Sequence, residues 1–376
     1  MSSDMTMALP AQFAQYIPAI VGKKQATVQY GPIGFDFGSD CIRLVQFARR
    51  DDALELSASA HVTCDAEIRA SAKRTRALVR KALRKHGFVG RDVVSCLPPD
   101  DVKIMMLSYL HQTGKQDEEL IVQRIAERVD DTINNYVIDF VMVRPNVKDG
   151  QERSALVAMA ARETVVTYLE CLRKAGLSVK VLEIESTAIR RLLLMKHGDD
   201  HKANLMTVSM GYAQTYISVL SGRRLIYERD IDFGERQLIA MLCEELDIDE
   251  REARSMLVRD ERPAIELSED EQTVSVTDGF YSVAKPLFME LVEDINRALV
   301  YAASETRGMP VERVYLTNTV ATWRGIEKFI DSLIEVPVSV LVPFEGFNHT
   351  HASTTELDPR GALVAGMALH GLTETG

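Results

Sequence analysis

The sequence predicts an α/β protein made of two similar halves. Short segments in which apolar residues alternate, as in strands, are followed by segments with apolar residues at helical spacing, and this order recurs along the chain. The hairpin pattern of residues 32–47, PIGFDFGSDCIRLVQF, returns in residues 205–234 with the same layout. Aligning Gly38 with Gly211 gives a repeat of about 173 residues. Each hairpin is followed by a further strand, so the two halves share one plan.

Composition and charge exclude several classes of protein. The chain has 376 residues, 46% of them hydrophobic, and a net charge of −11 without a basic block, so we expect no nucleic-acid binding. No apolar run reaches the roughly 18 residues of a membrane span and no signal peptide is recognisable, so we expect no direct membrane insertion. Five widely spaced cysteines without a C-x-x-C pair argue against a disulfide framework and a zinc site. These features predict a cytoplasmic protein.

Changes in pattern along the chain predict its division into domains. Residues 1–30 are expected to form a flexible leader, because Pro18 would interrupt a helix there, although apolar residues near helical spacing also fit a docking segment. A first domain is predicted at 31–200 and a second at 201–376. Within the first domain, residues at about 92–161 include a strand, a helix and two strands, which indicates a small α+β insertion.

One predicted helix has a strongly basic outer side. Residues 67–88, EIRASAKRTRALVRKALRKHGF, carry one apolar stripe that includes Leu78, Val79 and Leu83, and the basic residues face away from it. We interpret this segment as a surface helix with a solvated basic face. The pattern does not indicate a nucleic-acid site.

The turn of the first hairpin is a candidate ligand site. Asp36 comes just before Gly38 and Ser39, so backbone N–H groups of the turn would point at an anion while the carboxylate holds magnesium or its water. The alternative is an ordinary hairpin turn in which Asp and Ser make local hydrogen bonds. The short D-x-G-S pattern leaves both interpretations open.

The order of five motifs resembles the PilM family of type IV pilus assembly proteins, which belongs to the superfamily of actin, sugar kinases and heat-shock chaperones. The motifs are GFDFGSDCIRLV at 34–45, VLEIESTAIRRLL at 181–193, the second hairpin at 207–234, VYLTNTVATWRGI at 314–326 and RGALVAGMAL at 360–369. The resemblance implies an actin-like fold of two domains, with mixed sheets flanked by helices and a small α+β subdomain inserted in the first. It also implies a cleft between the two hairpins.

The resemblance assigns nucleotide-binding roles within this cleft. Backbone groups of the first turn would meet phosphate, Asp36 would face the metal, and Glu185 would reach the metal or water. Asp36 and Glu185 are thus the catalytic candidates, although Glu185 also suits a helix N-terminus. The implied ligand is Mg-ATP, with magnesium only alongside nucleotide. The full set of implied nucleotide-binding residues is Asp36, Gly38, Ser39, Glu185, Gly211 and Thr215.

The sequence departs from the superfamily pattern at two places. Ser209 stands where the second hairpin normally has an acid, and a hydroxyl cannot supply that charge. The adenosine loop is normally Gly-Gly-Gly, whereas this chain has Asn318–Val320, whose side chains should crowd the nucleoside. These departures predict a degenerate cleft and favour a protein that is not an enzyme. The alternative is a working ATPase or kinase in which Asp230 or Asp232 replaces the missing acid.

The resemblance also implies a function and a partner. We expect a scaffold of a type IV pilus or type II secretion-like machine that binds the cytoplasmic N-terminal segment of an inner-membrane protein resembling PilN. The segment would lie in a groove involving residues near Val93 to Leu107, where an extended peptide adds to a sheet edge. This contact would recruit the chain to the inner face of the membrane. An actin-like polymer, formed by self-association, is a further alternative.

Overall fold

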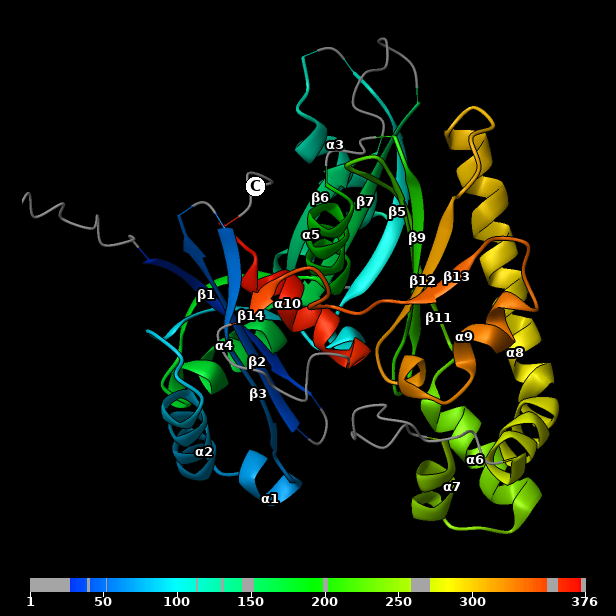
Figure 1. The fold of residues 1–376 in the computed structure, drawn as a ribbon. Helices are drawn as coiled ribbons and strands as arrows, with labels where there is room; N and C mark the ends of the chain where they lie inside the picture. The colour runs from blue at the N-terminus through cyan, green and yellow to red at the C-terminus, as the bar shows by residue number, and fades with distance from the viewer. Residues whose placement is uncertain are drawn as a thin grey trace, which may run out of the picture.

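A computed structural model of the chain describes residues 28–38, 41–51, 53–112, 114–129, 132–143, 152–198, 202–257, 271–349 and 358–372. Three sheets organise these residues, and helices cover them (Figure 1). Of the predicted leader, residues 1–30, only the last three lie in the described part, where they begin the first strand. No helix in the described segments is long and apolar enough to cross a lipid bilayer.

The first sheet has six strands in the order β14-β3-β2-β1-β4-β8. β1 and β2 form the predicted hairpin, with Asp36 opposite Arg43, while β4 and β8 continue the sheet in parallel. β14 comes from the second half of the sequence and pairs in parallel with β3. The strand bounds are β1 Val28–Phe37, β2 Cys41–Arg50, β3 Ala53–Thr63, β4 Asp92–Cys96, β8 Ser178–Glu183 and β14 Asn348–His349.

The second sheet repeats this topology in five strands, β11-β10-β9-β12-β13. β9 has the place of β1, because it pairs antiparallel with the next strand of its hairpin and in parallel with β12. Ser209 is the next-to-last residue of β9, as Asp36 is of β1. The prediction of two similar halves is confirmed. The strand bounds are β9 Asn204–Met210, β10 Thr215–Ser221, β11 Arg224–Ile231, β12 Arg313–Thr317 and β13 Val338–Val340.

The predicted α+β insertion is also present. Its three antiparallel strands, β5 Lys103–Leu110, β7 Glu152–Ala161 and β6 Tyr136–Met142, pack one face on α3, Asp117–Ala126. On the other face, Ile104, Met106 and Leu156 join the large core of the second half. β4, at the start of the range predicted for the insertion, pairs within the first sheet, and the separate sheet spans 103–161.

Helices cover both faces of the first sheet. Ile33 and Phe35 of β1 pack with α2, Ala72–Lys85, and α4, Arg162–Lys174, whereas Gly34 between them faces α10, Ala362–Ala368. The prediction of a single helix at 67–88 is wrong, because the segment contains two helices. α1, Ala66–Arg69, ends before Ser71, whose hydroxyl accepts from the Arg74 amide at 3.4 Å and begins a new helix.

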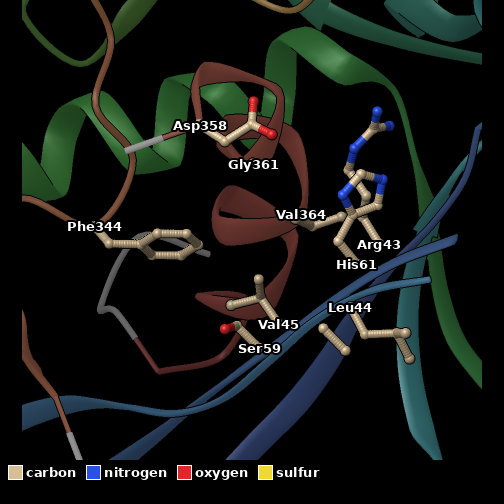
Figure 2. A pocket seen from close by; sticks show the side chains of 10 residues that line it. Arg43, Leu44, Val45, Ser59, His61, Phe344, Asp358, Gly361 and Val364 are labelled. Atoms are coloured by element: carbon tan, nitrogen blue, oxygen red, sulfur yellow. The ribbon is translucent and has the colours of Figure 1, made fainter. Parts of the chain in front are cut away.

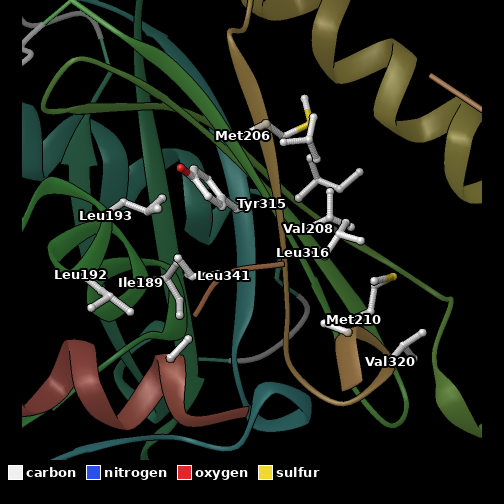
Figure 3. Close-up of a cluster of buried hydrophobic side chains, with 14 of the residues drawn as sticks. Ile189, Leu192, Leu193, Met206, Val208, Met210, Tyr315, Leu316, Val320 and Leu341 are labelled. Carbon is white, nitrogen blue, oxygen red and sulfur yellow. The ribbon is translucent and has the colours of Figure 1, made fainter. Parts of the chain in front are cut away.

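The second sheet lies between helices of both halves. Figure 3 shows Ile189, Leu192 and Leu193 of α5 on one side of this sheet and Met206 and Val208 of β9 on the other. The remaining helices are α6 Glu235–Leu246, α7 Glu250–Leu257, α8 Glu271–Glu305 and α9 Ile326–Asp331, and α5 spans Glu185–His197. The acidic segment 243–257 is divided between α6 and α7 at Asp247, which has a left-handed φ of 51°.

α5 and α10 cross at backbone contact. A Cβ added to Gly366 of α10 would lie 2.5 Å from the carbonyl carbon of Ala188 on α5, which is too close for any side chain. At the crossing, Arg191 donates to the Gly366 carbonyl at 2.7 Å and to both carboxylate oxygens of Glu183 at 3.0 and 2.8 Å. Both charged side chains are only 7% exposed. The crossing therefore needs glycine at 366 and a paired arginine at 191.

We expect Gly366→Ala to lower the free energy of unfolding by about 2–4 kcal/mol, because the added methyl group forces the two helices apart. Thermal or chemical unfolding measures the loss. Gly279→Ala is the matched control, since Gly279 also lies in a helix but its added Cβ meets nothing within 4 Å. That control should be neutral or slightly stabilising. Equal effects of the two substitutions would contradict the tight crossing.

Candidate nucleotide cleft and neighbouring cavity

The first hairpin ends in a paired carboxylate. Arg43 Nη1 lies 3.0 Å from Asp36 Oδ2, and both side chains are largely buried. Arg69 donates to the Gly38 carbonyl, and its guanidinium lies 4.3 Å from the centre of the Phe37 ring. The predicted phosphate-binding residue Ser39 lies outside the described residues. Asp36 thus already has a cationic partner where the resemblance implies magnesium.

The sequence contained a signal for this partner. Residues that are equally distant from the middle of a tight turn face each other across a hairpin, which puts Arg43 opposite Asp36. Sequence reasoning considered the carboxylate without this neighbour. A charge balanced by arginine is less available to a metal ion.

Ser209 and Glu185 meet in the cleft. The Ser209 hydroxyl donates to Glu185 Oε1 at the start of α5, and the Asn318 amide donates to Ser209 at 3.3 Å. Glu185 Oε2 is buried and accepts no hydrogen bond within the described residues. Burial raises the pKa of Glu185 to about 7, the Asp36 charge adds to the shift, and the Ser209 hydroxyl opposes it. The predicted departure, Ser209, thus bonds directly to a predicted site residue.

The second hairpin turn is tightly closed. Gly211 N–H donates to the Gln214 carbonyl at 3.0 Å, and a Cβ on Gly211 would lie 2.9 Å from that oxygen. Gly211 is therefore the residue that allows this turn to pack closely. Thr215 is fully buried, and its hydroxyl donates to the Phe233 carbonyl at 2.8 Å. The Thr215 hydroxyl thus has a partner within the protein.

The loop after β12 keeps one property of the glycine that the superfamily has there. Asn318 has a φ of 73°, in the left-handed region that glycine and asparagine adopt most readily. Its side chain accepts from the Thr319 hydroxyl at 3.2 Å while it donates to Ser209. Val320 is fully buried, so its side chain packs in the core. Of these three residues, Asn318 is the one whose side chain contacts Ser209, on the neighbouring strand β9.

Sequence reasoning missed a buried carboxyl, Glu228 on β11. It is 5% exposed, and neither of its carboxylate oxygens has a hydrogen-bond partner among the described residues; the same holds for the buried Ser186 hydroxyl. Burial raises the pKa of Glu228 to about 8; the nearby Ser186 hydroxyl, which lies outside ordinary hydrogen-bond geometry, opposes the shift, and the charges of Glu185 and Asp230 add to it. The alternative hypothesis had named Asp230 and Asp232, which lie further along the same chain segment.

A glutamate among the apolar residues of a predicted strand was the available signal for Glu228. The segment Leu225–Tyr227 precedes it, and Ser218 faces it on β10. Periodicity shows that such a strand is buried on one side, but it does not show which neighbours an acid meets there.

These residues fit magnesium only in part. Magnesium bound with nucleotide takes one or two protein carboxylates, with water and phosphate as its other ligands. Glu185 offers one buried oxygen without a protein partner, whereas Asp36 is paired with Arg43. No group of three or more His, Cys, Asp or Glu side chains in the described segments is arranged to hold a metal ion. Glu185 is therefore the residue that would hold a magnesium ion bound with nucleotide.

A cavity of about 610 Å³ lies beside the second hairpin, between the insertion and the second sheet. Residues 99–103 form one wall, within the range predicted for the partner groove, whereas Val93 and Leu107 are fully buried. Tyr216 of β10 donates its hydroxyl to the Pro99 carbonyl at 3.2 Å. The lining is polar and of mixed charge: Asp100, Asp101, Asp230, Lys103, Arg128 and Gln214.

A second cavity, of about 20 Å³, lies between the first sheet and the start of α10 (Figure 2). Arg43 and His61 line it from β2 and β3, and Asp358 from the turn before α10. Burial raises the pKa of Asp358, but hydrogen bonds from Arg360 and the charge of Arg43 hold that pKa below its usual value. The space fits about one water molecule, so it is too small for a nucleotide.

The duplicated sheets and the crossed helices α5 and α10 define an actin-like fold. The sequence model of the family "Type IV pilus assembly protein PilM" matches residues 34–371, and the chain belongs to this family. The resemblance seen in the sequence is thereby confirmed.

Two solved structures illustrate the fold. A chain from a structure described as the PilM-PilN type IV pilus biogenesis complex is similar with a TM-score of 0.71 and 21% identity, covering 91% of this chain and 99% of that one. The ethanolamine utilization protein EutJ from Carboxydothermus hydrogenoformans is similar with a TM-score of 0.53 and 14% identity, covering 91% and 90%. Both confirm the predicted fold class.

We expect Glu228→Gln to stabilise the protein at high pH. An acid whose pKa rises from 4.5 to about 8 on folding binds its proton more tightly in the folded state, so stability falls as the pH rises between these values. Glutamine removes that penalty. The variant should match the wild type near pH 5 and exceed it by about 2–4 kcal/mol at pH 8.5 in chemical unfolding.

The exposed Glu244→Gln on α6 is the control for this prediction and should show no such pH-dependent difference. A Glu228→Gln variant that is less stable than the wild type at pH 8.5 would show that the ionised carboxylate has a stabilising partner.

Proposed function

We propose that this protein is a cytoplasmic scaffold of a type IV pilus or type II secretion-like machine, which binds the cytoplasmic N-terminal segment of an inner-membrane protein resembling PilN. Membership of the PilM family supports this proposal, and so does the fold shared with a chain of a PilM-PilN complex. The partner segment recruits the protein to the inner face of the membrane.

The observation that carries the proposal is the 610 Å³ cavity beside the insertion. It lies next to residues 99–103, which lead from the first sheet into β5, and β5 is an edge strand of its three-stranded sheet. An extended peptide can pair with such an edge while its side chains enter the cavity. Charges of both signs on the walls, including Asp100 and Arg128, would fix the direction and register of the peptide.

The nucleotide cleft of this scaffold is degenerate in our proposal. Phosphoryl transfer depends on positioned charges that neutralise the phosphates. Here Asp36 pairs with Arg43, and Ser209 uses its hydroxyl on Glu185. One observation favours the alternative of a working ATPase: Glu228 is a buried carboxyl without a hydrogen-bond partner among the described residues and interacts electrostatically with Glu185. It is a candidate replacement for the acid that Ser209 lacks, and because its pKa is raised to about 8 it would carry a charge near neutral pH only where a bound cation stabilises the ionised form. Polymer formation stays a separate hypothesis, which cosedimentation tests.

We expect no saturable Mg-ATP turnover above that of the Asp36→Ala variant, because the cleft lacks its second carboxylate. Phosphate release measured over a range of ATP concentrations tests this expectation, with Glu228→Gln as a parallel variant. Turnover that is abolished by Asp36→Ala would reject the degenerate cleft, and its simultaneous loss in Glu228→Gln would assign the missing charge to that residue.

We expect Val102→Trp to weaken binding of the partner's N-terminal segment by at least about tenfold, because the indole fills the cavity that Val102 lines. Fluorescence anisotropy with a labelled synthetic segment of the PilN-like partner measures the affinity. Val89→Trp is the control, since Val89 is 45% exposed and does not line the cavity. Unchanged affinity in Val102→Trp would place the groove elsewhere.

A further inference from the structure

The outer side of the first domain carries an unusually basic surface, which we name the basic face. Its members are exposed lysines and arginines on α2 and beside it, and none forms a salt bridge within the described residues. The chain as a whole has a net charge of −11, so the charge of this cluster is opposite in sign to that of the whole protein. The basic face consists of Lys73, Arg76, Arg80, Lys81, Arg84, Lys85, Arg91 and Arg173.

The fold holds this face outward. Val79, Ala82 and Leu83 bury the opposite side of α2 against the first sheet. The helix therefore cannot rotate to bury its charged side chains. It also has no free apolar side that could insert into a lipid bilayer. Its surface of 14 residues is about 20 Å long. Any ligand of this face must bind by charge.

Two arguments indicate that the charges have a use beyond solubility. A Cβ on Gly176 would lie 3.6 Å from Arg76 Nε and 4.0 Å from Arg91 Nη1, so two guanidinium groups converge on one turn. In addition, the first turn of α2 has no acid and carries Lys73, which is unfavourable at the positive end of a helix dipole, whereas Arg74 beside it is paired with Glu67 at 3.1 Å. A bound array of anions would relieve both repulsions.

The shape and composition of the face favour lipid over other polyanions. Most of it is the surface of one helix, α2, and its members include no aromatic side chain on which a base could stack. A lipid surface presents many phosphates in one plane, and clusters of four to eight lysines and arginines on a helix are typical binders of anionic membranes. We propose that the basic face binds anionic lipid headgroups by charge alone, without insertion.

The position of the face agrees with a membrane contact that leaves the other sites free. It lies on the side of the first sheet opposite α10, as the alternation along β1 shows. α4 begins beside the cavity, at Ala161, and ends near Gly176, within the basic face. One helix of 13 residues, about 20 Å long, therefore separates the cavity from the lipid contact. This proposal rests on the proposed function in one respect, namely that the protein lies close to a membrane. The charge of the basic face is independent of that function.

Vesicle flotation of the full chain tests the proposal. We expect binding to vesicles of phosphatidylcholine with roughly 30% phosphatidylglycerol at low salt, little binding to pure phosphatidylcholine, and loss of binding as salt screens the charges. The triple variant Arg76→Glu, Arg80→Glu, Arg84→Glu should bind at least about a hundredfold more weakly. The matched control has the same change of net charge on the second domain: Arg251→Glu, Lys285→Glu, Lys328→Glu.

Three outcomes would overturn the proposal: no binding of the wild type to the anionic vesicles at low salt, equal losses in the two triple variants, or binding of duplex DNA or a polyglutamate peptide without binding of vesicles. Unchanged circular dichroism and thermal unfolding confirm that the first triple variant is folded. The partner segment is titrated separately in solution, without vesicles, where this variant should keep full affinity. Failure of that titration with the wild type would reject the proposed function and leave the lipid contact standing.

Discussion

The two halves of this protein depend on the crossing of α5 and α10. Gly366 lets the α10 backbone lie directly on Ala188, and Arg191 joins α5, the Gly366 carbonyl and Glu183 at the end of β8. Two buried charges are tolerated there because every bond of the pair is short and the guanidinium forks onto the carboxylate. Since α5 starts at Glu185, the same crossing fixes where the cleft carboxylate points. The same helix crossing therefore holds the two halves together and positions the candidate site residue Glu185.

Local patterns were sufficient to predict most of the fold. The hairpins, the inserted α+β unit and the repeat were visible because strand alternation, turn residues and helical spacing are properties of neighbouring residues. The break before Ser71 was missed, because a cap interrupts a helical pattern that otherwise continues. Order and spacing of weak motifs then indicated the family, which no single motif could do.

The site was less predictable, because its interactions are not local. The sequence showed that Ser209 lacks a charge, but not that its hydroxyl donates to Glu185 from another sheet. Glu228 was missed for the same reason: its burial follows from the register of β10 with β11 and from the α5 residues packed over that sheet. Ser209, which departs from the family pattern, thus has a hydrogen-bond partner, Glu185, that only the folded structure shows. Of the two departures, Ser209 forms hydrogen bonds, whereas Val320 of the second one packs its side chain in the core.

The hydroxyl of Tyr216 links the second hairpin to the wall of the cavity beside it. It belongs to the strand that follows the second hairpin turn, yet it donates to Pro99 in the wall of the cavity. A ligand that moved this turn would stretch or break that bond, and a peptide that shifted residues 99–103 would pull on the turn. By thermodynamic reciprocity, each ligand would then change the affinity of the other by the same factor. If both proposed sites bind their ligands, one phenolic hydroxyl would couple the candidate nucleotide site to the candidate peptide groove.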